Sequence, residues 1–156
     1  MISFERVSKR YAEGHDALRE VSFDIARDDL VFLTGHSGAG KSTLMRLIML
    51  MDRVTRGKVV INGVDLATVA RRNIPAHRRD IGVVFQNHQL LFDRPVFDNV
   101  ALPLIISGYE YREVGRRVRA ALDKVGLLSK ERAMPLTLSG GEQQRVGIAR
   151  AVVGRP

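Results

Sequence analysis

A glycine-rich loop at residues 35–42 constrains the fold of this chain more than any other feature. It reads Gly-His-Ser-Gly-Ala-Gly-Lys-Ser, which fits the phosphate-loop pattern G-x-x-x-x-G-K-[ST]. The compact apolar run 30–34 precedes the loop directly, and apolar residues recur at helical spacing from Leu44 to Met51 behind it. A buried strand, a glycine loop and a helix in this order predict an α/β fold built on a central sheet.

Each residue type in this phosphate loop (residues 35–42) suits a different part of phosphate binding. Glycines allow unusual backbone angles, so backbone N–H groups can surround a phosphate without side-chain clash. Lys41 is predicted to reach the β- and γ-phosphates of a nucleotide, Ser42 to offer its hydroxyl to Mg²⁺, and Thr43 to contact the α-phosphate. A glycine-rich turn that merely precedes a helix is the alternative. The predicted contacts are Gly35, His36, Ser37, Gly38, Ala39, Gly40, Lys41, Ser42 and Thr43.

A second glycine loop, residues 138–145, reads Leu-Ser-Gly-Gly-Glu-Gln-Gln-Arg. Ser139, Gly140 and Gly141 expose their N–H groups just before a predicted helix. Such a terminus attracts anions because its first N–H groups lack partners and the helix dipole is positive there. Two phosphate-facing glycine loops in one chain are more specific than either alone.

Hydrophobic periodicity places the remaining elements. Strand-rich sequence fills residues 1–87 and helical sequence follows to about residue 137, so we expect an α/β core with a helical insertion before Ser139. The predicted strands are 2–7, 21–26, 30–34, 57–61 and 81–85, and the predicted helices are 44–51, 100–107, 109–125 and 142–153.

Composition excludes several kinds of site. The chain has no cysteine, so disulfides and cysteine metal sites are impossible, and its 4 histidines show no metal-ligand spacing. No apolar run approaches the roughly 20 residues that span a bilayer. The first residues lack a signal-peptide pattern. We therefore expect a cytoplasmic protein that can dock on a membrane protein.

The net charge of +8 has three possible explanations. A solvated basic face is favoured, a face near anionic lipid headgroups comes next, and nucleic-acid binding comes last. The basic pairs Arg71-Arg72, Arg78-Arg79 and Arg116-Arg117 are dispersed, and no aromatic stacking residues alternate with them. We expect no nucleic-acid partner.

Taken together, these motifs resemble those of the ATP-binding-cassette (ABC) ATPases. Residues 138–142 match the signature motif of that family, Gln86 falls at the glutamine of its Q-loop, and Tyr11 at an aromatic residue that stacks on adenine. The resemblance implies that ATP and Mg²⁺ are the cofactors, that Gln86 touches Mg²⁺ and the attacking water, and that Lys41 and Gln86 are catalytic. Tyr11 as an ordinary aromatic and Gln86 as an ordinary loop residue stay open. The implied ATP contacts in the second glycine loop are Ser139, Gly140, Gly141 and Glu142.

Residues 87–94 and 96–104 extend the resemblance, over the whole chain, to the bacterial cell-division ATP-binding proteins. It implies a head-to-tail homodimer that closes on ATP, an integral membrane partner resembling FtsX, and a peripheral position on the cytoplasmic face of the inner membrane at the division septum. Lipoprotein-release or macrolide-export ATPases and a non-catalytic ATP-dependent scaffold are the alternatives. A repair-type ATPase would carry long coiled coils, which this sequence lacks. Residues 86–107 are either core or the surface for the partner's coupling helix.

The fold that the resemblance implies is a P-loop NTPase core with an antiparallel β subdomain and an inserted helical subdomain. Residues 1–87 and 139–156 would form the core and β subdomain, and residues 88–138 the helical subdomain. Leu50 and Val54 replace a glycine and a proline that are usual in the family. The sequence ends before the strand that bears the family's Mg²⁺-binding Asp and catalytic Glu. We expect a C-terminally truncated chain that binds ATP weakly and hydrolyses it negligibly, and a complete protein that is an ATPase.

Overall fold

The computed structural model describes residues 1–12 and 14–156. Contacts divide the chain into two compact units, Met1–Arg78 and Arg79–Pro156. Each unit has a hydrophobic core of its own. The predicted division places residues 1–87 and 139–156 in one part and residues 88–138 in another. It follows the subdomains that the family resemblance implies, which differ from units defined by contacts, and it stays a prediction.

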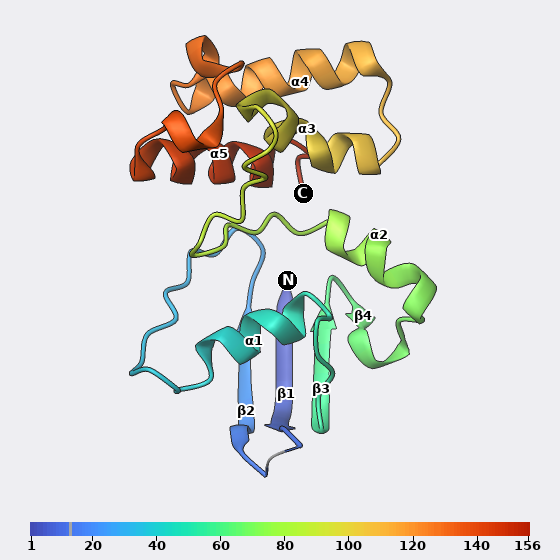
Figure 1. Ribbon diagram of the computed structural model, residues 1–156. Coiled ribbons are helices and arrows are strands. Elements are labelled where there is room, and N and C mark those ends of the chain that lie inside the picture. Colours follow the sequence, from blue (N-terminus) through green and yellow to red (C-terminus); the bar gives the residue numbers. More distant parts are fainter. Residues whose placement is uncertain (13) are drawn as a thin grey trace. The chain divides into compact units, whose positions relative to one another are not determined.

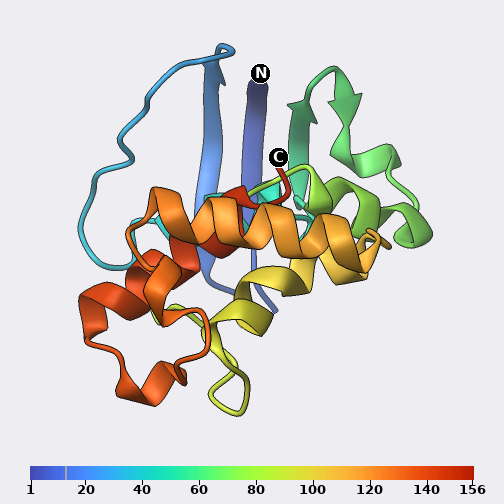
Figure 2. The same cartoon turned by 90° about the horizontal axis from the view of Figure 1, so that it is seen from above.

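The first unit is an antiparallel sheet with strand order β2-β1-β3-β4, against which helix α1 packs (Figure 1). The predicted strands at 2–7, 21–26 and 57–61 are confirmed, and the first two are longer than expected. A long loop leads from β2 to α1 (Figure 2). The elements are β1 (Ile2–Arg10), β2 (Asp16–Ile25), α1 (Lys41–Ile48), β3 (Arg56–Ile61), β4 (Val64–Asp65), the short 3₁₀ turns Leu66–Thr68 and Arg71–Asn73, and α2 (Ile74–Arg79).

The core of the first unit joins α1 to the sheet. Phe4 on β1 stacks on its cross-strand partner Phe23 with ring centroids 4.6 Å apart. Leu44 and Leu47 lie one turn apart on α1, so both face the sheet. The buried members of this core are Phe4, Val7, Leu18, Leu44, Leu47, Leu50, Val59 and Leu66. This packing holds the end of the phosphate loop, where α1 begins, against the sheet.

The two buried strands predicted at residues 30–34 and 81–85 are not strands in the structure, so both predictions are wrong. Neither segment is a strand in the described chain, and Leu30 and Phe32 are 84% and 81% exposed. A strand needs a neighbour for its backbone N–H and C=O groups, and no described strand pairs with either segment. An apolar run shows that a segment seeks burial, whereas strand formation also depends on a partner elsewhere in the chain.

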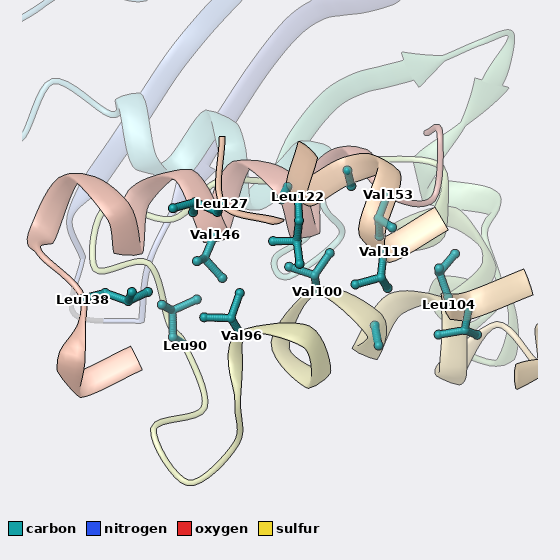
Figure 3. Packing of buried hydrophobic residues seen from close by; sticks show 14 residues of the cluster. Leu90, Val96, Val100, Leu104, Val118, Leu122, Leu127, Leu138, Val146 and Val153 are labelled. Carbon is teal, nitrogen blue, oxygen red and sulfur yellow. The ribbon is translucent and has the colours of Figure 1, made fainter. Parts of the chain in front are cut away.

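The second unit is a helical layer around one apolar cluster (Figure 3). Helix α3 packs on α4 and α5, and α4 also packs on α5. The predicted helices are confirmed with ends shifted by a few residues. Among the described residues, no helix has the length and apolar character needed to cross a bilayer. The elements are α3 (Val96–Ile106), α4 (Tyr111–Lys124), the 3₁₀ turns Leu128–Lys130 and Pro135–Thr137, and α5 (Gly140–Val152).

Candidate phosphate-binding site

The phosphate loop is an open turn that ends on the N-terminus of α1. Gly38 and Gly40 have φ of 83° and 88°, a region that favours glycine. Gly40 is the N-cap of α1, and no side chain caps this terminus among the described residues. The first N–H groups of α1 are therefore available to an anion, where the helix dipole also favours negative charge.

Gly40 is also fixed by close packing. A Cβ atom at this position would lie 2.5 Å from the carbonyl oxygen of Ala17 and 2.7 Å from Cδ2 of Leu18. Both neighbours belong to β2. The start of α1 can therefore approach the sheet this closely only with glycine at residue 40.

Lys41 folds back over its own loop. Its Nζ atom donates hydrogen bonds to the carbonyl oxygens of Gly35 at 2.6 Å and His36 at 2.7 Å. These bonds place the ammonium group beside the loop, where it would meet a phosphate held by the loop. An ammonium group has three donors and one full positive charge, so it can bind a phosphate as a point charge.

Ser42 and Thr43 lie in the first turn of α1 and differ in exposure. Ser42 is exposed, whereas Thr43 is buried with 8% of its surface accessible. A hydroxyl oxygen is a ligand type that Mg²⁺ accepts, usually together with water and phosphate oxygens. Ser42 therefore fits the role of a protein ligand to Mg²⁺ beside a bound phosphate, and the contact of Gln86 with Mg²⁺ stays a prediction.

Tyr11 is held at the end of β1 by a small polar cluster. Its hydroxyl donates to Asp52 Oδ2 at 2.9 Å, and Lys9 Nζ lies 4.9 Å from the ring centroid. A hydrogen bond from Arg46 Nε, 2.6 Å from the same carboxylate oxygen, lowers the pKa of Asp52. The ring is thus oriented through its hydroxyl, and stacking on adenine stays a prediction.

Gln86 is exposed in a turn of the second unit. His88 and Gln89, later in the same turn, have φ of 54° and 45°, which is strained for residues other than glycine. Arg150 on α5 donates to both of their carbonyl oxygens, at 2.8 Å for Gln89. Burial lowers the pKa of Arg150. This arginine therefore holds the turn after Gln86 against α5.

The second glycine loop forms the capped start of α5. Ser139 is the N-cap, and its hydroxyl and the Glu142 side chain form a reciprocal capping box. The carboxylate oxygen Oε2 of Glu142 accepts from the Ser139 N–H at 2.9 Å and from its hydroxyl at 3.1 Å. Lys130 donates to the other oxygen of Glu142. Together, Lys130 and the Ser139 N–H lower the pKa of Glu142 to about 2.

The predicted site residues thus fall into two groups. The first unit contains Tyr11 and the phosphate loop, and the second contains Gln86 and the second glycine loop. Sequence reasoning missed three side chains that hold these residues: Asp52, Lys130 and Arg150. Each of the three makes its contact with a residue at least 12 positions away in the sequence, so no local pattern indicated them.

Comparison with known proteins decides the family. Residues 18–156 match the profile of the family described as ABC transporter. The chain belongs to the ABC transporter family. The predicted resemblance and fold class are confirmed, since its structural relatives are ABC ATPase cassettes.

Individual relatives agree with this assignment. The cell division ATP-binding protein FtsE of Escherichia coli (strain K12) is 56% identical over 156 residues, covering 100% of this chain and 70% of the relative. FtsE of Haemophilus influenzae is 47% identical over 100% of this chain and 72% of its own length. A dimeric structure of MJ0796, a bacterial ABC transporter cassette, superposes with a TM-score of 0.91 at 35% identity, covering 100% of this chain and 71% of that chain.

Proposed function

We propose that this protein is the ATP-binding subunit of an ABC-type membrane complex and that it couples ATP binding and hydrolysis to an integral membrane partner in bacterial cell division. The observation that carries the proposal is the phosphate loop on the N-terminus of α1, which no described side chain caps, with the Lys41 ammonium beside it. The relatives named cell division ATP-binding protein support the biological role.

In this proposal the phosphate loop holds the ATP phosphates. Its backbone N–H groups and the dipole of α1 bind the anion, and Lys41 moves from the carbonyls of Gly35 and His36 to the β- and γ-phosphates. Ser42 is one protein ligand for Mg²⁺. When bound, Mg²⁺ supplies charge neutralisation at the phosphates. Tyr11 stacks on the adenine.

A second copy of the chain completes the site. The N-terminus of α5, with Ser139, Gly140 and Gly141, binds the γ-phosphate that the phosphate loop of the other copy holds. The related cassette MJ0796 has been solved as a dimer, and a second dimeric structure of it contains ADP and Pi. ATP then joins two copies head to tail, and Gln86 orients the attacking water.

The membrane partner in this proposal resembles FtsX. Residues 86–107 offer it a surface, since Leu91, Phe92, Ile105 and Ile106 are between 40% and 62% exposed. Exposed apolar side chains in one segment favour a protein contact over solvent. The protein would then sit peripherally on the cytoplasmic face of the inner membrane at the division septum.

Titration calorimetry with MgATP tests the proposal. Wild-type protein should bind MgATP, and Lys41→Ala should weaken the affinity at least about tenfold, since a direct charge contact with phosphate is lost. Lys58→Ala is the matched control, because Lys58 is exposed on β3 and lies 4.0 Å from Glu5, outside the phosphate loop. Equal MgATP affinity in wild type and Lys41→Ala would refute the proposal.

A further inference from the structure

We propose that Lys130 is a positioning residue for the second glycine loop, which it prepares for a phosphate by neutralising Glu142. The inference rests on the proposed function, because it concerns ATP held between two copies. Lys130 lies outside every recognised motif, at the end of the 3₁₀ turn Leu128–Lys130. The helix that it serves, α5, begins at Gly140.

Three residues form a chain of hydrogen bonds. Lys130 Nζ contacts Glu142 Oε1, and Glu142 Oε2 accepts from both the N–H and the hydroxyl of Ser139. The Glu142 side chain is only 18% exposed and that of Lys130 is 43% exposed. The ion pair therefore lies at the protein surface with its acidic partner mostly covered, directly beside the start of α5.

Glu142 creates a charge problem for this terminus. A carboxylate in the first turn stabilises a helix, yet it repels a second anion that approaches the same N–H groups. With a pKa of about 2, Glu142 stays ionised at neutral pH, so protonation does not remove the repulsion. A fixed cation is needed, and Lys130 supplies it at the oxygen that points away from Ser139.

The same contact keeps the Glu142 carboxylate on Ser139, and the N–H groups of Gly140 and Gly141 have no hydrogen-bond acceptor among the described residues. Because Lys130 holds Oε1, the other oxygen of Glu142 stays on Ser139 and does not swing across the helix start. At Gly140 and Gly141 an added Cβ would meet no heavy atom within 4 Å in the described chain. No described neighbour therefore lies on the Cβ side of these two glycines, so the surface beside the start of α5 is open on that side.

A charge-rescue experiment tests the inference on the native protein. Dimer formation is measured by sedimentation with Mg²⁺ and a non-hydrolysable ATP analogue. Lys130→Met should weaken dimerisation about tenfold, because it leaves an uncompensated charge near the phosphate. The double variant Lys130→Met with Glu142→Gln should dimerise severalfold more tightly than Lys130→Met alone, since the uncompensated charge is gone. Lys130→Arg should dimerise like wild type.

Arg119→Met is the matched control, because it breaks an ion pair of 3.0 Å with Glu131 in the same unit and leaves Glu142 untouched. It should not change dimerisation. Thermal melts of each variant show that it is folded. The inference would be overturned if Lys130→Met dimerised as tightly as wild type. It would also be overturned if adding Glu142→Gln did not restore the dimerisation that Lys130→Met loses. A wild-type protein that stays monomeric with the analogue would instead refute the proposed function, and the inference with it.

Discussion

Gly40 is the residue of the phosphate loop at which the structure most strongly requires glycine. A Cβ would lie 2.5 Å from the Ala17 carbonyl oxygen, and φ is 88°. Gly40→Ala should therefore lower the free energy of unfolding of the first unit by about 3 kcal/mol, which combines left-handed strain with overpacking. Urea denaturation followed by circular dichroism measures the loss.

Gly38 provides the control for this change. Its φ of 83° is similar, but a Cβ there would meet nothing within 4 Å in the described chain. Gly38→Ala should cost only the backbone strain, about 1 kcal/mol. Equal losses in the two variants would show that the close approach to Ala17 does not constrain the loop.

The pKa of Glu142 provides a second prediction about a single residue. Its pKa of about 2 lies below the ordinary 4.5 because the folded chain stabilises the carboxylate. Its contribution to stability is therefore complete above about pH 4.5 and disappears as the pH falls through about 2. Lys130→Met should raise the pKa toward 4.5, which a carbon-detected NMR titration would show, and Arg119→Met should not. An unchanged pKa in Lys130→Met would contradict the assigned cause.

The roles of single residues were only partly predictable from sequence. The phosphate loop and the capping pattern Ser139-x-x-Glu142 are local, so their spacing alone indicates them. The contacts of Lys130 and Asp52 depend on how distant segments pack. No local pattern shows that Asp52 receives both Tyr11 and Arg46.

At the scale of elements, Asn99 holds the start of α3. Its side chain is fully buried. The side-chain oxygen Oδ1 accepts a hydrogen bond from the Leu91 N–H at 2.7 Å, and Nδ2 donates one to the Leu91 carbonyl oxygen at 2.9 Å. Asn99→Ala should reduce the free energy of unfolding by about 3 kcal/mol, because buried backbone groups lose their partners. Chemical denaturation measures this against Asn73→Ala, an exposed asparagine whose loss should cost under about 0.5 kcal/mol. Similar values for both variants would rule out this anchoring role.

Arg150 links α5 to the turn that follows Gln86. Arg150→Met should remove the hydrogen-bond donor of the His88 and Gln89 carbonyl oxygens. Both residues have strained positive φ angles. Amide hydrogen exchange at residues 86–89 should then accelerate about tenfold, because the turn opens more readily. Arg112→Met, on the exposed side of α4, should leave exchange in the turn unchanged. Unchanged exchange in Arg150→Met would show that the turn holds itself.

Helices were easier to predict than strands for a physical reason. The apolar stripe of α4, with Val114, Val118 and Leu122, repeats within one segment and marks the buried face directly. Strands need partners, so the apolar runs 30–34 and 81–85 look alike whether or not another strand lies beside them. The short helix α2 carries no buried residue, and thus no periodic signal.

At the scale of the whole molecule, the central claim is a site shared between two copies. Each glycine loop offers the N-terminus of a helix, and in the proposed dimer one phosphate group bridges both. Disabling one loop in one copy and the other loop in a second copy should therefore leave one complete site in a mixed dimer.

The most direct test is a mixing experiment followed by sedimentation with Mg²⁺ and a non-hydrolysable ATP analogue. Wild-type protein should dimerise, whereas Lys41→Ala and Ser139→Arg should each stay monomeric when alone. Mixed together, the two variants should form dimers, because the phosphate loop of one meets the intact Ser139 of the other. A mixture that stays monomeric while wild type dimerises, or a variant that dimerises alone as well as wild type, would contradict the shared site.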